Sequence, residues 1–250
     1  MPRSPGFAVL GDNEGMRFRV LACDYDGTVA SEGVLAQDTV DSLHRLRDSG
    51  RRAVLVTGRV LDELLEICED VDVFDLAVVE NGALLYNPAT GRQQLLGPPL
   101  PRRFTAALQA RGVTPLSVGR AICSTWEPFE DVVVRTIHEM GLDLQVIFNK
   151  RSVMVLPASV NKATGLTTAL HQLSETAEAT VAVGDAENDL VMLGLAGCGV
   201  AVGNALDSVK DRADLVMAGS AGSGVRELIE GMLRDDLASA LAGAVQRRAG

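Results

Sequence analysis

Short apolar runs alternate with amphipathic segments in the first third of the chain. The runs are rich in β-branched residues and predict buried strands at 18–23, 53–56 and 76–79. Between them, apolar residues recur at helical spacing and predict helices near 35–46 and 61–68. Strands that alternate with helices in this way predict an α/β fold, built on a Rossmann-like, doubly wound parallel sheet.

The pattern changes after Gly82. Two short apolar segments flank a turn-forming stretch at 87–91, which predicts an antiparallel hairpin, and helices and strands in irregular order follow it. We interpret residues 83–158 as a smaller α+β cap domain, inserted into a core that consists of 17–82 and 159–250. Residues 1–16 show no periodicity and are interpreted as a flexible leader.

In the second half of the core, the alternation predicts helices at 162–173 and 189–195 and strands at 180–183, 199–202 and 214–217. A last helix is expected from about residue 225 to 233. The stretch that we interpret as the cap is expected to contain helices near 102–111 and 129–140, and strands near 116–124, 144–148 and 153–156.

Composition narrows the class of protein. A formal net charge of −10 argues against a general nucleic-acid-binding surface, which needs Lys and Arg to neutralise phosphates. The sequence shows neither a long apolar run that predicts a transmembrane helix nor a signal-peptide pattern. The four cysteines are widely spaced, which favours buried free thiols over disulfides or zinc, so we expect a cytoplasmic protein.

Two carboxylates follow the first predicted strand, in the run Asp24-Tyr25-Asp26-Gly27-Thr28. A carboxylate at the end of a buried strand is partly desolvated and needs a compensating cation. Two acids so close together, followed by a glycine turn, suit a hard cation with oxygen ligands. The alternative is an ordinary loop that contains two acidic residues.

Acids gather again after the strand at 180–183, in the run Gly184-Asp185-Ala186-Glu187-Asn188-Asp189. These groups would repel one another without a cation, which favours a metal site that includes Asp185 and Asp189. The alternative is a helix N-terminus with acidic residues in its first turn.

Two weaker signals suit a phosphate group. Thr57, Gly58 and Arg59 follow the second strand and offer a hydroxyl and an unhindered backbone N–H, although Arg59 could pair with a surface acid instead. Lys162 stands at the predicted start of a helix, where a cation opposes the helix dipole, and this cost suggests a compensating anion.

In this order, the four clusters resemble the motifs of the haloacid dehalogenase superfamily of phosphohydrolases. The resemblance covers the core on both sides of the insert, about two-thirds of the chain. An insert between the second and third motifs, opened by Glu80-Asn81-Gly82-Ala83, looks like the cap of the Cof-type, class IIB members. Its compact size is similar to that of phosphoglycolate phosphatase caps.

The resemblance implies a catalytic scheme. Asp24 would attack phosphorus and become an aspartyl-phosphate, with Asp26 as the acid–base partner. Mg²⁺ would be held by the Asp24 carboxylate, the Asp26 backbone carbonyl and Asp185. Asp189 would be a ligand through water or would orient Lys162.

The resemblance also implies how a substrate is held. The residues expected to contact phosphate are Thr57, Gly58, Arg59, Asn81, Lys162 and Asn188. The partner would be a small phosphorylated metabolite of the sugar phosphate, phosphoglycolate or mannosyl-3-phosphoglycerate type, and neither nucleic acid nor a membrane. The side chains that could read it are Asn81, Arg120, Trp126 and Lys150. Trp126 could equally belong to the core of the cap, and Lys150 and Arg151 to a solvated turn.

The sequence leaves alternatives for the oligomeric state and the activity. The protein would be a monomer or a homodimer. A phosphomutase or a non-catalytic module that binds phosphate ligands is an alternative to the hydrolase. The three histidines, His44, His138 and His171, lie in amphipathic stretches and are expected at surface or partly buried helix positions rather than on a metal.

Overall fold

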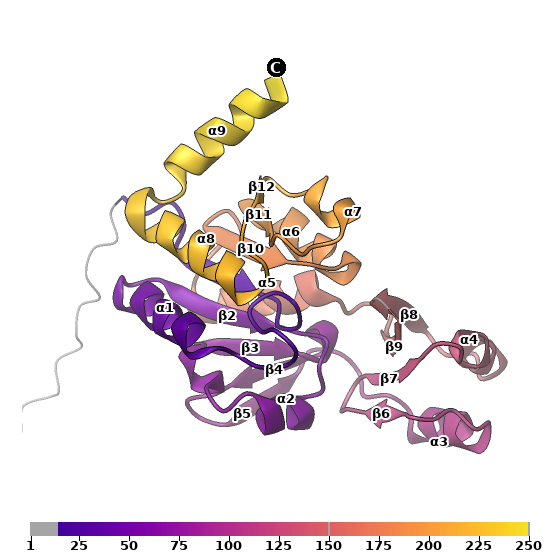
Figure 1. Ribbon diagram of the computed structural model, residues 1–250. Coiled ribbons are helices and arrows are strands. Elements are labelled where there is room, and N and C mark those ends of the chain that lie inside the picture. Colours follow the sequence, from indigo (N-terminus) through magenta and orange to yellow (C-terminus); the bar gives the residue numbers. More distant parts are fainter. Residues whose placement is uncertain (1–14, 150, 250) are drawn as a thin grey trace, which may run out of the picture.

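The computed structural model describes residues 15–149 and 151–249. It contains two sheets, which lie in two adjoining lobes (Figure 1). The larger sheet has eight strands in the order β12-β11-β10-β1-β2-β3-β4-β5, and the smaller has four in the order β6-β7-β9-β8.

Six strands of the larger sheet are parallel and form the centre of the core. They are short, and their residues are almost all apolar and buried, as expected for strands that helices cover on both faces. They are β1 (Val20–Cys23), β2 (Arg52–Val56), β3 (Leu76–Val79), β10 (Thr180–Gly184), β11 (Cys198–Ala201) and β12 (Leu215–Val216). The predicted parallel sheet is confirmed.

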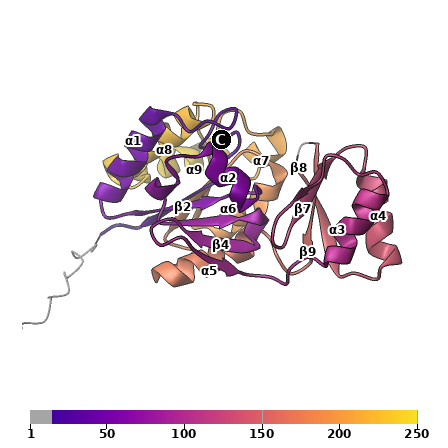
Figure 2. The same cartoon turned by 90° about the horizontal axis from the view of Figure 1, so that it is seen from below.

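Helices cover both faces of this sheet (Figure 2). On one face α1 (Gln37–Asp48) packs against α8 (Gly222–Asp235), and on the other α5 (Lys162–Leu173) packs against α6 (Leu190–Leu195). The fold is therefore doubly wound, as predicted. The remaining core helices are α2 (Leu61–Ile67), α7 (Asp207–Lys210) and α9 (Ala238–Ala249), with 3-10 turns η1 (Val71–Val73), η2 (Glu80–Gly82) and η3 (Glu187–Asp189).

The predicted hairpin is present, as β4 (Leu84–Asn87) and β5 (Arg92–Leu95). However, β4 pairs antiparallel with β3, so the hairpin extends the core sheet instead of opening the cap. Leu84 and Leu85 are buried in the core cluster, and this packing explains the pairing. The predicted domain boundary at residue 83 is therefore wrong, and the second sheet begins only with β6.

The cap lobe consists of the four-stranded sheet and two helices that share a separate apolar cluster with it. Its elements are α3 (Arg102–Ala110), β6 (Ser117–Val118), β7 (Cys123–Trp126), α4 (Glu130–Glu139), β8 (Leu144–Asn149) and β9 (Ser152–Pro157). The single strand predicted near 116–124 is instead the hairpin β6–β7, because Gly119 and Ile122 close a turn within it through a backbone hydrogen bond.

Other predictions concern the ends of the chain and its cysteines. Most of the predicted leader, residues 1–14, lies outside the described residues. All four cysteines are buried free thiols, as predicted. In the part of the chain that the structure describes, no helix has both the length and the apolar character needed to cross a bilayer.

Strand order determines where the functional side chains meet. The chain leaves β1 toward β2 on one side, whereas β10 lies against β1 on the other side. The strand order therefore reverses next to β1, and in sheets of this kind the ligand site lies at such a point, beyond the carboxyl ends of the strands. The loops after β1, β2, β3 and β10 all begin at the carboxyl-end edge of the sheet. The cap lobe lies beside this edge (Figure 2).

Candidate active site

Three buried carboxylates converge at this edge of the core sheet. Asp24 follows β1 and Asp185 follows β10, and the two strands are paired with Cys23 opposite Val183. Oxygen atoms of Asp24, Asp185 and Asp189 all lie within 4.8 Å of one another. Three negative groups at such separations repel one another strongly in a buried site, so the cluster requires cations.

Lys162 supplies one of these cations. It is the first residue of α5, which begins with a capping box at Asn161, and its side chain is fully buried. Its Nζ lies 2.5 Å from Asp24 Oδ1 and 2.5 Å from Asp189 Oδ1. Burial alone would lower the pKa of Lys162, but Asp189 and Asp24 together raise it above its usual value. The side chain is therefore a fixed ammonium group between two carboxylates.

One ammonium group does not compensate for three carboxylates. Burial and, next, the charge of Asp189 raise the pKa of Asp24, and with the opposing effect of Lys162 included it lies at about 7. A second cation beside Asp24 would favour its ionised form, which is the form that can act as a nucleophile.

The donor atoms at this position suit Mg²⁺. Asp24 and Asp185 present carboxylate oxygens, the ligands that hard cations prefer. Asp189 uses Oδ1 for Lys162, and its Oδ2 accepts the backbone N–H groups of Asp185 and Ala186 at 2.9 and 3.0 Å. Asp189 therefore orients Lys162 and shapes the loop, which was one of its two expected roles.

A buried acceptor next to the cluster also fits a hydrated ion. Among the described residues, Asn188 Oδ1 has no hydrogen-bond partner, although its Nδ2 donates to Asn81 Oδ1 at 3.3 Å. An unsatisfied buried oxygen is costly, and a water molecule bound to a metal would supply the missing donor. Thr28 contacts the cluster as well, through a 3.4 Å hydrogen bond to Asp185 Oδ1, and sequence reasoning did not single it out.

Asp26 is paired with an arginine. Arg59 Nε and Nη2 each lie 2.7 Å from one oxygen of the Asp26 carboxylate, and hydrogen bonding to Asp26 raises the pKa of Arg59. The guanidinium also lies over the Tyr25 ring, 5.8 Å from its centroid. Arg59 is therefore paired with an acid, but with Asp26 at the cavity and not with the surface acid that was the alternative to a phosphate. The Asp26 carboxylate does not belong to the cluster of Asp24, Asp185 and Asp189. This agrees with the sequence-based expectation, in which Asp26 would bind the metal through its backbone carbonyl and not through its side chain.

Thr57 and Asn81 complete the edge. Thr57 is buried at the end of β2, and its hydroxyl accepts the backbone N–H of Arg59 at 3.2 Å. The Asn81 backbone N–H donates to the Thr57 carbonyl at 2.9 Å, which ties the loops after β2 and β3 together. The sequence-predicted residues from four separate segments are thus brought to one place.

Comparison with known proteins decides the family. A family model for haloacid dehalogenase-like hydrolases matches residues 21–105 and 122–229. The chain belongs to this family. The resemblance that the motifs indicated is therefore confirmed.

Relatives of this hydrolase carry phosphatase names. It is 27% identical over 217 residues to phosphoglycolate phosphatase of Methanothermobacter thermautotrophicus, a match that covers 84% of the chain and 97% of the relative. It is 25% identical over 240 residues to 5-amino-6-(5-phospho-D-ribitylamino)uracil phosphatase of Bacillus subtilis, covering 86% and 96%. The solved structure of a subclass IIB sugar phosphatase of the superfamily has a similar fold, with a TM-score of 0.67, 19% identity and coverage of 86% and 97%.

The hydrolase has a cavity of about 300 Å³ between core and cap. From the core, Asp24, Asp26, Thr57, Gly58, Arg59 and Glu63 line it, and from the cap Trp126, Asn149, Ser152 and Met154. The cap approaches the core closely, because a Cβ on Gly58 would lie 3.2 Å from Met154 Sδ. The cavity is therefore enclosed on one side by the predicted catalytic groups and on the other by cap side chains.

The predictions for the cap side chains had different outcomes. Trp126 lines the cavity and is about half exposed, so it does not lie in the core of the cap, which was the alternative. Arg120 is not one of the residues that line it, and its Nη1 lies 3.5 Å from Asp62 Oδ1 instead. Lys150 lies outside the described residues.

Sequence reasoning missed Asn149, Ser152 and Met154, although a signal exists for two of them. Ser152 and Met154 are two residues apart on one strand and so share a face, and Ser152 pairs with Trp126 across β7 and β9. Strand alternation shows that these residues share a face. It does not show which face is turned toward the core, because that depends on how the cap is placed.

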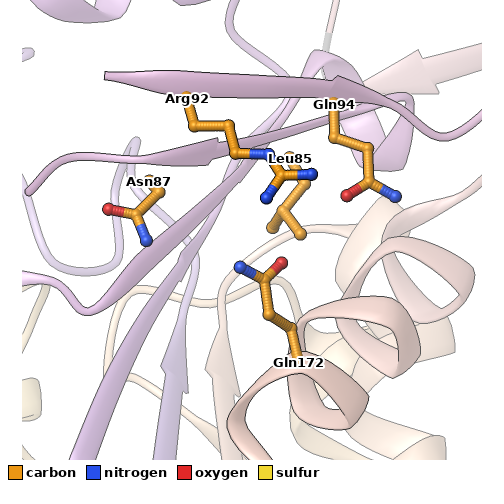
Figure 3. A pocket seen from close by; sticks show the side chains of 5 residues that line it. All are labelled: Leu85, Asn87, Arg92, Gln94 and Gln172. Carbon is orange, nitrogen blue, oxygen red and sulfur yellow. The ribbon is translucent and has the colours of Figure 1, made fainter. Parts of the chain in front are cut away.

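The hydrolase also has a much smaller hollow, about 10 Å³, between the β4–β5 hairpin and α5 (Figure 3). Leu85, Asn87, Arg92, Gln94 and Gln172 surround it. This volume holds roughly one water molecule. We therefore assign it no ligand. His44, His138 and His171 are exposed on α1, α4 and α5, as predicted.

Proposed function

We propose that this hydrolase is a Mg²⁺-dependent phosphatase that cleaves small phosphomonoesters through an aspartyl-phosphate on Asp24. One observation carries the proposal. The Asp24 carboxylate lines the cavity, with Lys162 Nζ 2.5 Å from one oxygen and Asp185 in the same cluster. A nucleophile, a fixed cation and oxygen ligands for a metal therefore meet where a phosphate ester can enter.

The reaction takes two steps. An oxygen of Asp24 attacks phosphorus, the bond from phosphorus to the ester oxygen breaks, and an acyl phosphate forms. Asp26 gives a proton to the departing oxygen and then takes one from the water that hydrolyses the acyl phosphate. Arg59 binds both oxygens of the ionised Asp26 carboxylate, the form that takes the proton of the water, and so fixes its direction for the second step.

The negative charge of the phosphoryl group would be bound by hydrogen-bond donors that are already positioned in the site. Lys162 has three N–H donors, of which two contact Asp24 and Asp189, so the third can bind a phosphoryl oxygen. The Thr57 hydroxyl can donate to another. Asp24, Asp185 and the Asp26 backbone carbonyl would hold Mg²⁺. When bound, this ion offsets the repulsion between the nucleophile and an anionic substrate.

The substrate class follows from the cavity and the relatives. About 300 Å³ suits a small metabolite and not a macromolecule. The two relatives are named for different phosphate esters at similar identity, so neither substrate transfers directly. Sugar phosphates, phosphoglycolate and mannosyl-3-phosphoglycerate therefore form the first panel to be tried.

The test is phosphate release from this panel with Mg²⁺. The wild type should release phosphate in proportion to substrate loss, and Asp24→Asn should abolish the release. Asp72→Asn, at an exposed position in η1, is the control and should keep full activity. Isomerised product without free phosphate would indicate a phosphomutase. Thermal stabilisation by the esters without turnover would indicate a binding module. Near-full turnover by Asp24→Asn would refute the proposal.

A further inference from the structure

We propose that Glu80 is a positioning residue that holds the cap over the active site through its buried carboxylate. Glu80 follows β3 in the core, and its side chain is fully buried. Its Oε1 accepts the backbone N–H of Arg120 at 2.9 Å, and its Oε2 accepts that of Ala121 at 2.7 Å. Both donors belong to the turn between β6 and β7 of the cap, so one core side chain holds the cap backbone at two points.

The chemistry of this contact suits a carboxylate specifically. An ionised carboxylate only accepts, and its two oxygens match two parallel N–H groups. The turn fits closely around it, because a Cβ on Gly119 would lie 2.6 Å from Glu80 Oε1. The absence of a side chain at residue 119 thus permits the close approach.

Two exposed contacts join the β6–β7 hairpin to α2. The Ser117 hydroxyl donates to Glu63, and Arg120 Nη1 lies 3.5 Å from Asp62 Oδ1. Exposed pairs of this kind contribute little to stability. Buried contacts therefore attach this turn to the core: the two hydrogen bonds to Glu80, and the apolar packing of Ala121 and Ile122 with Val60 and Ala83.

The next two residues after Glu80 contact the segments that carry the site residues. Asn81 binds the Thr57 carbonyl through its N–H and accepts a hydrogen bond from Asn188. Gly82 has φ +106°, and a Cβ there would lie 2.0 Å from the Asn161 carbonyl oxygen, so it packs directly against the start of the helix that carries Lys162.

The turn η2 therefore contacts the cap with its first residue, the phosphate-facing loops with its second, and the lysine helix with its third. Its geometry is also unfavourable for residues that have a Cβ, since both Glu80 and Asn81 have positive φ, at 53° and 55°. Contacts on all sides hold it in this shape. Loss of the Glu80 contact would release the cap and loosen the groups that bind phosphate.

The chain contains a built-in reporter for this movement. Trp126 is its only tryptophan, and it lines the cavity from the cap side, opposite core residues. In Glu80→Gln, an NH₂ group replaces one of the two carboxylate oxygens. This group cannot accept the backbone N–H of Arg120 or Ala121 that it faces, so one of the two hydrogen bonds is lost. We expect acrylamide to quench Trp126 fluorescence about twofold more strongly in this variant, because open cap orientations become populated. Glu66→Gln, at an exposed position on α2, is the control and should leave quenching unchanged.

Activity supplies a second readout. In Glu80→Gln, KM should rise and kcat should fall, with circular dichroism at 25 °C unchanged. A purely structural role would lower the melting temperature without altering KM or quenching. If Glu80→Gln does not fold, Gly119→Ala disturbs the same contact from the cap side and should raise quenching in the same direction. When both variants fold, their effects should be non-additive, since they act on one contact.

Unchanged Trp126 quenching in folded Glu80→Gln, or in folded Gly119→Ala where the first variant does not fold, would overturn the proposal. The quenching measurement needs no turnover, so it is independent of the proposed phosphatase activity. Inactivity of the wild type on all phosphate esters would affect the proposed function alone.

Discussion

Arg59 binds both carboxylate oxygens of Asp26, with its Nε and Nη2 atoms each 2.7 Å from an oxygen. The two residues come from the loops after adjacent strands, so the core sheet itself sets their separation. A bidentate pair fixes the plane of the carboxyl group as well as its position. The group that we expect to transfer protons is therefore oriented before any substrate arrives.

Replacement of Arg59 by lysine should test this orientation. Lysine keeps the charge but cannot bind both oxygens with the same planar geometry. We expect kcat to fall roughly 10- to 100-fold, within the range that general acid–base catalysis contributes, and KM to change less. Arg45→Lys is a matched control, because Arg45 binds both oxygens of Glu230 on the surface between α1 and α8. Wild-type kcat in Arg59→Lys would show that the pair is not needed.

Replacement of Lys162 by methionine should affect stability as well as activity. The change leaves the carboxylates of Asp24 and Asp189 buried without their shared cation. Removal of one partner from a buried ion pair costs about 3–5 kcal/mol, and urea unfolding should show a loss of this order. Phosphate release should disappear.

A second substitution separates these two effects of the lysine. Asp189→Asn in the Lys162→Met background should recover part of the stability and none of the activity. Wild-type stability in Lys162→Met alone would contradict the buried charge cluster.

Stability should depend on pH through Asp24 when metal is removed. Burial and Asp189 raise the Asp24 pKa from 3.8 to about 7 in the folded protein. Between about pH 4 and 7 the folded state therefore binds more protons than the unfolded state, and stability contributed by this group falls as pH rises through this window. In EDTA, Asp24→Asn should lack this loss and should be more stable than the wild type at pH 8, by about 1–3 kcal/mol.

Addition of Mg²⁺ at pH 8 should make the wild type more stable than Asp24→Asn, the reverse of the order expected in EDTA. Mg²⁺ should stabilise the wild type and have little effect on Asp24→Asn or Asp185→Asn, because a ligand that binds only the folded state raises its stability. Equal Mg²⁺-induced shifts in melting temperature for all three proteins would place the ion elsewhere.

Thr57→Val should show whether the buried hydroxyl acts on the substrate. Valine has nearly the same shape, so the fold should persist, while one donor to the phosphoryl group is lost. We expect kcat/KM to fall roughly 10- to 100-fold. Thr39→Val is the control, because Thr39 is equally buried and its hydroxyl accepts a hydrogen bond from Arg226, away from the cavity. Equal activity of both variants would exclude a role for Thr57.

The sequence predicted which side chains meet at one edge of the sheet wherever a polar residue follows directly on a strand. Asp24, Thr57 and Asp185 each follow a short apolar run, and parallel strands bring such positions to one edge. Lys162 could be placed only because it comes third in a set of four motifs with a fixed order. The structure brings it to Asp24 although 138 residues separate the two in sequence.

Contacts between lobes were beyond prediction from the sequence. The β4–β5 hairpin has the local pattern of any hairpin, and only its packing against β3 shows that it extends the core sheet. The role of Glu80 depends on two backbone N–H groups of the cap, which leave no trace in residue types. Helix α9 is mostly small and polar and follows a residue in the left-handed conformation, Leu237. A periodic apolar stripe strong enough to predict it is absent.

The most direct measurement is chemical trapping of the phospho-enzyme. The wild type and Asp26→Asn, in which hydrolysis of the intermediate should be slowed, are mixed with a turned-over ester and Mg²⁺, quenched in acid and reduced with borohydride, which converts an acyl-phosphorylated aspartate to homoserine. Peptide mass spectrometry should find homoserine at position 24 in both proteins and none in Asp24→Asn. Homoserine at position 185 or 189 instead, or phosphate release by Asp24→Asn at the wild-type rate, would contradict Asp24 as the nucleophile.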